Sequence, residues 1–393
     1  MDESKNREKR ITINFPKDFF WGSATSAYQV EGNILNNDWA IAAKDGKVPN
    51  AGLACDHYNR FTEDFDIVKS LGQNSYRFSV EWSRIEPEEG KFNEDAINHY
   101  REVINDLKSK GLEPFLTLWH FTLPDWFSAK GGFLSSDATK IFSRYCEYVV
   151  SKFGDDVVYF TVMNEPMVYA QKGFFQGQWP PFKKNIFKFL KVILKLQQAH
   201  VAAYKAIKSI NYNCKVGIVP SIVHFKADNK IWNKILSNIS DWFWNYRFIS
   251  SISAHTDFIG VNYYSHHKFG ENVIHEKTDM DWVIYPAGIY FVLKKLATYN
   301  KPLIITENGI ADIADNKRAK FITDHLWHIG EAILDGVPVI GYFYWSLLDN
   351  YEWSFGFDKK FGLVRVDFDT QKREILPSAF EYKKVCENNS LSM

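Results

Sequence analysis

The sequence predicts an α/β protein built as a single (β/α)8 TIM barrel. Eight short apolar runs recur along the chain, and longer segments with helical spacing separate them. Eight is the number of parallel strands that closes such a barrel. A doubly wound open sheet is the structural alternative, but it is disfavoured because no Gly-rich phosphate loop follows the first run.

Each run has the composition of a buried strand, because it is rich in β-branched or aromatic residues and is bounded by Gly, Pro, Asn or a charge. In chain order the runs are Phe19–Tyr28, Ser75–Val80, Glu113–Leu118, Tyr159–Met163, Lys215–Pro220, Phe258–Tyr264, Pro302–Thr306 and Val339–Trp345.

The segments between the runs place apolar residues three and four positions apart, as amphipathic helices do. In Asp64–Gly72 the side chains of Phe65, Val68 and Leu71 share one face, and Gly72 is a C-terminal cap signal. The same pattern predicts helices in Asp95–Gly111, Ile141–Gly154 and Leu196–Ile210.

The length, the apolar content and the net charge of the chain limit the class of protein. A chain of 393 residues with 46% apolar residues can fill one large barrel, so a single catalytic domain over residues 1–393 is expected, with residues 1–14 as a poorly ordered N-terminal segment. The formal net charge of +0 gives no electrostatic indication of a nucleic-acid or membrane partner, and neither is expected. A homo-oligomer is left open.

The four cysteines do not form a metal-binding or disulfide pattern, because Cys55, Cys146, Cys214 and Cys386 lie far apart. Reduced thiols in a reducing compartment are therefore expected. The first residues, "MDESKNREKRITINF", are charged and lack an apolar signal region, and no run approaches the length of a membrane span. The sequence predicts a cytoplasmic protein.

Polar and aromatic side chains follow the predicted strands, at the end where barrel enzymes build their active sites. Either Glu165, which follows the fourth run, or Glu307, which follows the seventh, would by itself be more typical of a helix N-terminal charge or a loop salt bridge. Together on one rim they indicate a site, because burying so many polar groups without a function costs several kcal/mol each unless they are paired. The residues at the strand ends are Gln29, Arg77, Glu81, His120, Asn164, Glu165, Asn262, Tyr264, Glu307, Trp345, Glu352 and Trp353.

At these residues the chain closely resembles glycoside hydrolase family 1, the retaining β-glycosidases on a (β/α)8 barrel. The matching segments run in the family's order from Phe19 to Phe368. They are "FFWGSATSAYQVEG", "YRFSVEWSRIEP", "LWHFTLPDW", "NEP", "FIGVNYY", "ITENG", "GYFYWSLLDNYEW" and "KKFGLVRVDF".

The resemblance implies a role for each matching residue. Glu165 of "NEP" is similar to the family's acid/base and Glu307 of "TENG" to its nucleophile, while Asn164 matches the residue that binds the sugar 2-hydroxyl. Arg77 and Tyr264 match the groups that hold the nucleophile charged and oriented, and Asn262 is counted as a supporting residue beside Arg77. The remaining substrate-binding positions implied are Gln29, His120, Trp345, Glu352, Trp353 and Phe361.

The chemistry of the family explains these residue types. Retaining hydrolysis uses two carboxyl groups about 5–5.5 Å apart, one of which attacks the anomeric carbon while the other protonates the leaving oxygen. Arg77 and the Tyr264 hydroxyl would favour the ionised form of Glu307. Glu165, in aromatic surroundings and near a negative partner, should stay protonated in the free enzyme.

The resemblance also bears on the substrate. Family members that act on 6-phosphorylated sugars replace the Glu352-Trp353 pair, and an acidic side chain would repel a phosphate. We therefore expect small β-glycosides or oligosaccharides with an unphosphorylated, non-reducing β-D-glucose, galactose or fucose. Two departures leave details open. Met167 lies where some members have an aromatic residue, so the aglycone preference is open. Glu81 either touches the substrate or forms a buried ion pair, and the ion pair is expected because a lone buried charge is costly.

Two other functions are weighed against this one. A metal-dependent barrel hydrolase needs clustered His and Asp ligands, and the strand ends offer only His120 in a suitable place. A sugar-binding barrel without turnover is disfavoured because both carboxylates are present. No metal ion and no cofactor is expected.

Overall fold

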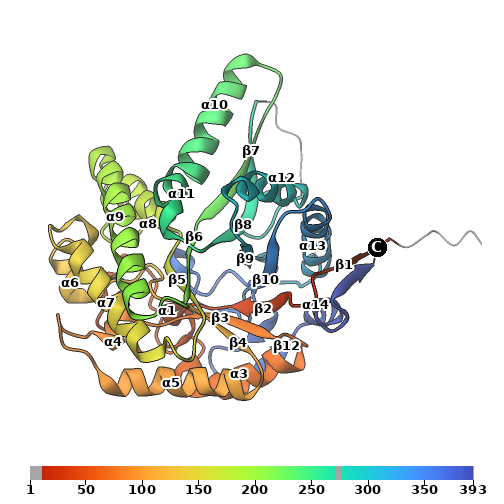
Figure 1. Ribbon diagram of the computed structural model, residues 1–393. Helices are drawn as coiled ribbons and strands as arrows, with labels where there is room; N and C mark the ends of the chain where they lie inside the picture. The colour runs from red at the N-terminus through yellow and green to blue at the C-terminus, as the bar shows by residue number, and fades with distance from the viewer. Residues whose placement is uncertain (1–10, 271–275, 393) are drawn as a thin grey trace, which may run out of the picture.

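The computed structural model of the chain describes residues 11–270 and 276–392, and it shows a closed barrel of parallel strands with helices around it (Figure 1). Strand β6 pairs with both β5 and β8, so the sheet closes on itself and the open-sheet alternative is wrong. The barrel strands are β2 (Phe20–Ala24), β3 (Ser75–Ser79), β4 (Glu113–Thr117), β5 (Tyr159–Asn164), β6 (Lys215–Val219), β8 (Phe258–Phe269), β9 (Leu303–Asn308) and β10 (Val339–Trp345). The predicted fold class is thus confirmed, with one strand in each predicted run.

The first predicted run is longer than the strand that it contains. Strand β2 ends at Ala24, and the following residues turn into the short helix α1 (Ala27–Val30). Ser26, the residue before this helix, has an extended backbone, and its hydroxyl donates to Gln29 Oε1 at 2.6 Å. The turn brings the Gln29 side chain to the rim of the barrel.

The predicted helices all form, and two of them end at glycine as expected. Helix α3 (His57–Ser70) is followed by Gly72 at φ +70°, and α5 (Glu94–Ser109) by Gly111 at φ +69°, a left-handed conformation that glycine adopts without strain. The other helices are α2 (Asp38–Lys44), α4 (Trp82–Ile85), α6 (Asp125–Ala129), α7 (Ala138–Phe153), α8 (Pro166–Ala170), α9 (Ile186–Ile210), α10 (Ile231–Asp241), α11 (Arg247–Ile252), α12 (Ala287–Leu296), α13 (Arg318–Leu334) and α14 (Pro377–Asn388).

The inside of the barrel below the rim is filled by aromatic side chains. Phe115 of β4 stacks on Tyr159 at 4.4 Å between ring centroids and meets Phe343 of β10 at 4.7 Å. Phe258 belongs to the same buried cluster, and the half-buried Phe20 packs against it. The cluster closes the barrel from below, so the rim at the carboxyl ends of the strands is the face that can hold a substrate.

Two pairs of short strands lie outside the barrel. Strand β1 (Thr12–Asn14) pairs antiparallel with β13 (Ser390–Ser392), and β11 (Val364–Val366) pairs with β12 (Arg373–Ile375). The expectation of poor order in residues 1–14 therefore does not hold for Thr12–Asn14, because β13 supplies their hydrogen-bond partners. Residues 1–10 lie outside the described residues.

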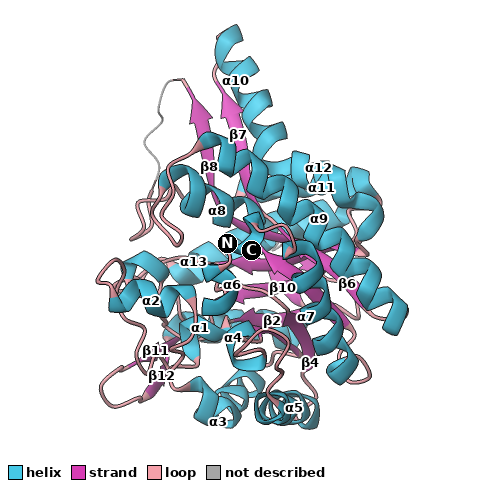
Figure 2. Ribbon diagram, turned by 90° about the vertical axis from the view of Figure 1, so that its left-hand side faces the viewer, coloured by secondary structure: helices cyan, strands magenta, loops and turns pink. Residues whose placement is uncertain are grey.

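One projection rises from the barrel rim and was not predicted. Strand β8 continues past Tyr264 to Phe269, where it pairs with β7 (Ser221–Ala227), the strand that follows β6 after Pro220. The next helix, α10, packs along this ribbon, and both views show the three elements standing out from the rest of the molecule (Figures 1 and 2). None of the described helices is long and apolar enough to cross a bilayer.

Candidate active site

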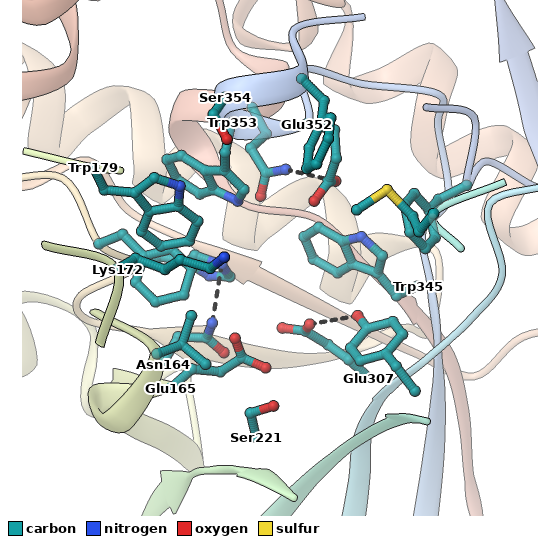
Figure 3. Close-up of a pocket in the computed structure, with 18 of the residues that line it drawn as sticks. Asn164, Glu165, Lys172, Trp179, Ser221, Glu307, Trp345, Glu352, Trp353 and Ser354 are labelled. Atoms are coloured by element: carbon teal, nitrogen blue, oxygen red, sulfur yellow. Dashed lines mark hydrogen bonds between the residues drawn. The ribbon is translucent and has the colours of Figure 1, made fainter. Parts of the chain in front are cut away.

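A cavity of about 530 Å³ opens at the carboxyl ends of the barrel strands (Figure 3). Its walls bring together residues that lie far apart in the sequence. Ten of the predicted site residues line it: Gln29, His120, Asn164, Glu165, Tyr264, Glu307, Trp345, Glu352, Trp353 and Phe361. The two predicted supporting residues, Arg77 and Asn262, lie behind this wall, where both are buried.

Glu307 lies near the end of β9, and two donors from other strands hold its carboxylate. The Arg77 guanidinium donates to Glu307 Oε1 at 2.6 Å, and the Tyr264 hydroxyl donates to Oε2 at 2.7 Å. Arg77 and Glu307 are both buried, so the ion pair between them is shielded from water. Both carboxylate oxygens thus meet a donor that favours the negative charge, which is how a nucleophile is kept ionised and fixed in direction.

Glu165 has a different environment at the tip of β5. Its backbone is left-handed, with φ 44° and ψ 58°, and Pro166 begins helix α8 directly after it. This turn directs the side chain into the cavity, where Oε1 accepts a hydrogen bond from the neutral Asn262 amide at 2.9 Å. Burial and the negative charge of Glu307 raise the pKa of Glu165 to about 8.

A buried hydrogen-bond network connects the two carboxyl groups. Asn164 Oδ1 accepts from Arg77 at 2.7 Å and from Asn262 at 3.3 Å, so its amide nitrogen must be the donor toward His120 Nε2, which lies 3.1 Å away. His120 then accepts at Nε2 and is neutral. Burial, together with the nearby Arg77, lowers the pKa of His120 well below its ordinary value, which agrees with this assignment.

The two carboxyl groups point toward one another across the cavity (Figure 3). One is held by a cation and a hydroxyl donor, and the other is buried beside a neutral amide. Their surroundings therefore favour opposite protonation states, which is the arrangement that acid catalysis beside a charged nucleophile requires.

The opposite wall carries Gln29 and Glu352. Gln29 Nε2 donates to the Tyr351 carbonyl at 2.8 Å and to Asn350 Oδ1 at 3.0 Å, and it lies 3.5 Å from Glu352 Oε2. Burial, and less strongly the charge of Glu307, raises the pKa of Glu352 to about 8. At neutral pH this carboxyl can both donate to and accept from a sugar hydroxyl.

Three aromatic rings with nearly parallel planes lie beside these polar groups. The His120 ring lies nearly parallel to Trp345, with centroids 5.9 Å apart, and nearly parallel to Trp353 at 6.1 Å. Trp345 ends β10, where its carbonyl oxygen would lie 1.8 Å from a side-chain carbon at Gly309. Gly309, directly after Glu307-Asn308, is thus required for the close approach of the β9 and β10 ends.

Sequence reasoning missed the outer part of the cavity. The additional lining residues come mainly from loops and from the π-helical turn Gln171–Gln176, whose positions no strand-end pattern indicates. They are Phe121, Val168, Gln171, Lys172, Gln178, Trp179, Ser221, Ser265, Met280, Trp282, Ser354 and Phe355. Met167, the residue flagged as a departure, is buried and is not part of the lining.

The predicted ion pair of Glu81 is wrong. Among the described residues its carboxylate has no Lys, Arg or His within 4.0 Å; it accepts instead from the hydroxyls of Ser83 at 2.6 Å and Thr122 at 2.9 Å, and from Asn37 at 3.3 Å. Burial raises the pKa of Glu81. Neutral donors satisfy this buried group, so it supports the loop after β4 and does not face the cavity.

The described residues contain no group of three or more His, Cys, Asp or Glu side chains arranged to hold a metal ion. The cavity therefore gives no support to the metal-dependent alternative. Its own donors and acceptors suit a neutral polyhydroxylated ring that has an apolar face.

Comparison with known proteins places the chain in a family. The family model "Glycosyl hydrolase family 1" matches residues 11–248 and 233–391. β-Glucosidase A of Thermotoga maritima is 34% identical over 96% of this chain and 98% of its own length. A 6-phospho-β-galactosidase of Staphylococcus aureus is 30% identical over 97% of this chain and 100% of its own.

A solved structure agrees in both sequence and shape. The β-glycosidase from Pyrococcus horikoshii is 40% identical, with a TM-score of 0.91 over 97% of this chain and 96% of that one. These matches do not favour a metal-dependent hydrolase or an inactive sugar-binding barrel. The chain belongs to glycosyl hydrolase family 1.

Proposed function

We propose that the chain is a retaining β-glycosidase that removes terminal, non-reducing β-D-glucosyl residues, or the related galactosyl or fucosyl residues. Family membership makes it an O-glycosyl hydrolase of the β-glucosidase type. The observation that carries the proposal is the pair of buried carboxyl groups with unlike partners in one cavity: a cation and a hydroxyl at Glu307, a neutral amide at Glu165. A single catalytic domain in the cytoplasm is part of the proposal, supported by four cysteines that are all free and buried.

The proposed reaction has two steps. In the first, Glu307 attacks the anomeric carbon while Glu165 gives its proton to the leaving oxygen, and a covalent glycosyl-enzyme forms. Once Glu307 is esterified its charge is gone, so Glu165 is more acidic and can take a proton from the incoming water. Water then attacks the same carbon from the side that the leaving group left, and two inversions give overall retention.

Each neighbouring residue has a proposed part in these steps. Arg77 and Tyr264 keep Glu307 ionised before attack and stabilise it again when the ester breaks. Asn164, whose amide is already oriented by Arg77 and Asn262, is placed to bind the sugar 2-hydroxyl beside the reacting carbon. Gln29, His120 and Glu352 bind the other hydroxyls, with Trp353 and Phe361 in the same wall and Trp345 against the ring face.

The pH dependence of kcat/KM follows from the raised pKa of Glu165. Because the first step needs the protonated acid, kcat/KM should stay high above the ordinary pKa of glutamic acid and fall about tenfold per pH unit once Glu165 ionises near pH 8. We expect the alkaline limb to appear with alkyl and phenyl β-glucosides. The measurement is kcat/KM between about pH 4 and 10 with circular dichroism at each pH as a folding control. An alkaline limb near pH 5 would contradict the assignment.

The substrate proposal concerns the 6-position of the sugar. Lys172 is the one Lys or Arg among the described residues that line the cavity; its Nζ donates to Gln178 Oε1 at 2.7 Å, and burial lowers its pKa. Glu352, which faces the same cavity, is an acidic side chain and cannot bind a phosphate as a cation would. An unphosphorylated sugar is therefore the proposed substrate, although one relative has the name of a 6-phospho-β-galactosidase.

A panel of nitrophenyl β-D-glycosides that differ at C4 and C6 tests both parts of the proposal. We expect kcat/KM for the glucoside to exceed that for its 6-phosphate by at least about a hundredfold, since an uncompensated dianion in a buried site costs several kcal/mol. Proton NMR of the first-formed sugar should show the β-anomer. Equal rates on the 6-phosphate would overturn the substrate proposal, and an initial α-anomer would overturn the retaining mechanism.

A further inference from the structure

Helix α10 is oriented with its apolar side toward the solvent. Its large apolar side chains recur at intervals of three and four and are all exposed: Ile231, Trp232, Ile235, Leu236, Ile239 and Trp242, the residue after the helix. The side chain that is buried on α10 is the small, polar Ser237. These six residues, called here the α10 face, therefore do not contribute to the core of the chain.

Exposure of this kind is unusual. A single exposed apolar residue needs no explanation, but a continuous stripe that contains two tryptophans does, because water is a poor environment for such a surface. Trp232 is 73% exposed and Ile231 is 65% exposed. Ile, Leu and Trp on one side of a helix, with Lys230 and Lys234 at its edges, is the pattern of a helix that lies in the interface of a membrane.

The start of helix α9 offers a second apolar projection nearby. Phe187 is 80% exposed and Ile186 is also exposed. Phe189 of the same turn contacts Phe243, which follows α10, with 6.1 Å between ring centroids. The two projections are thus joined through packed rings, and α9, α11 and α10 follow one another along one side of the molecule (Figure 1).

The charge of this region is strongly positive in a chain whose total is zero. Residues 171–250 contain thirteen Lys and Arg but two Asp and no Glu, a net charge of +11, so the rest of the chain carries −11. The segment includes both apolar projections. A charge imbalance of this size attracts a negatively charged surface, and the total charge of the chain does not reveal it.

The lysines beside the projections are free to act on a partner. Lys183, Lys184 and Lys188 flank Phe187, and Lys226, Lys230 and Lys234 flank the α10 face; all six are exposed. Across residues 11–270 and 276–392, none of the six has a carboxylate within 4.0 Å, whereas Lys208 in the same segment pairs with Asp257 at 2.6 Å. No carboxylate of the described residues therefore neutralises their charge.

From these observations we propose that the α10 face and the start of α9 bind the surface of a bilayer that contains anionic lipids. The apolar side chains would enter the headgroup region, and the lysines would meet lipid phosphates. The protein would be peripheral and reversible in its binding, as no described helix could span the bilayer.

A second copy of this chain is the other occupant to consider. A twofold dimer through this surface would place the same lysines of both copies against each other, because a twofold interface is self-complementary. Like charges brought together in this way cost several kcal/mol. An anionic bilayer satisfies the apolar side chains and the lysines at the same time, so the charge favours it.

The surface lies beside the catalytic rim. Helix α10 packs along the ribbon of β7 and β8. Residues Tyr264 and Ser265 of β8 line the cavity before the strand continues to Phe269. Binding through this surface would hold the barrel at the membrane without occupying the cavity. The inference does not depend on the proposed function, since the α10 face contains no cavity residue.

Sedimentation with lipid vesicles tests the proposal on the full chain. We expect binding to vesicles of phosphatidylcholine with about 30% phosphatidylglycerol, weaker binding to pure phosphatidylcholine, and loss of binding between about 0.05 and 0.5 M NaCl. Absence of binding to the anionic vesicles at low salt would overturn the proposal.

Substitutions distinguish binding through the α10 face from non-specific adsorption of the protein to vesicles. Trp232→Ser should lower the partition coefficient about tenfold, and Lys230→Glu with Lys234→Glu should lower it at least about tenfold, because each lysine near an anionic surface is worth about fivefold. The matched controls are Leu334→Ser, an exposed leucine of α13, and Lys372→Glu in the turn between β11 and β12, both of which should bind as the unchanged chain does.

Glucosidase activity and thermal unfolding of each variant should remain unchanged, since all these side chains are exposed and outside the cavity. Equal binding of Trp232→Ser and Leu334→Ser would overturn the proposal. So would a dimer, seen by analytical ultracentrifugation, that Trp232→Ser abolishes in a chain that does not bind anionic vesicles; that result would assign the face to a second copy.

Discussion

Replacement of Glu307 by glycine is expected to abolish turnover, with a loss of at least about 10⁴ in kcat. The reason is that no other described carboxylate in the cavity has two charge-stabilising donors; Glu307 takes one from Arg77 at 2.6 Å and one from Tyr264 at 2.7 Å. Without it no covalent intermediate can form, and Arg77 is left with the Asn164 amide oxygen and the Thr306 carbonyl as partners.

Three measurements check this result. A 2-deoxy-2-fluoro glycoside with a good leaving group should add one sugar to the unchanged chain, at Glu307 by peptide mass analysis, and none to Glu307→Gly. Azide should restore turnover of glycosyl fluorides or dinitrophenyl glycosides in the variant and give the α-glycosyl azide, because azide then attacks from the nucleophile's side. The exposed Glu276→Gly is the control and should be fully active. Substantial activity of Glu307→Gly without added azide would contradict the proposed role.

The barrel could be predicted because its signals are local. A buried parallel strand needs apolar, β-branched or aromatic residues on both faces, and each helix needs an apolar stripe, so alternation of the two patterns is visible along the chain. The ribbon of β7 and β8 was missed for a related reason. Its strands, Ser221–Ala227 and the end of β8, are partly exposed and contain His and Lys, so they lack the continuous apolar run that marked the others.

The floor and inner wall of the cavity were predicted because they stand at strand ends, where the barrel itself fixes position. Glu165 follows β5 directly, and Glu307 lies within the last residues of β9. The outer wall depends on loop conformation. Lys172 and Gln178, for example, reach the cavity from a π-helical turn and its loop, which no periodicity in the sequence indicates.

The prediction for Glu81 failed because it considered only charge. A buried carboxylate can be satisfied by an opposite charge or by enough neutral donors, and sequence does not show how many hydroxyls will surround it. Here Ser83 and Thr122 each donate a hydroxyl hydrogen bond, and Asn37 donates one from its amide. The net charge is incomplete in a comparable way, because a sum over the whole chain removes the contrast between residues 171–250 and the remainder.

Replacement of Glu165 by alanine is expected to act selectively, according to the leaving group. With an alkyl or phenyl glucoside, kcat/KM should fall by about 10³–10⁴, because the departing oxygen has no proton donor. With a 2,4-dinitrophenyl glucoside, kcat/KM should change little, since that leaving group needs no proton, but kcat should fall because water must attack the intermediate without a base.

Azide distinguishes this variant from Glu307→Gly. As a small anion it needs no general base and fits the space that the Glu165 carboxylate leaves, so it should raise kcat on the dinitrophenyl substrate and give the β-glycosyl azide. The alkaline limb of the pH profile should disappear in the same variant, because the group whose pKa burial and Glu307 raise to about 8 is then absent. Asp38→Asn is the matched control, since burial also raises the pKa of Asp38 to about 8 but its carboxylate accepts from the Leu123 amide outside the cavity; it should keep the limb. Full activity of Glu165→Ala on the phenyl glucoside would show that the proton comes from another group, and an α-glycosyl azide from this variant would place Glu165 on the nucleophile's side of the sugar.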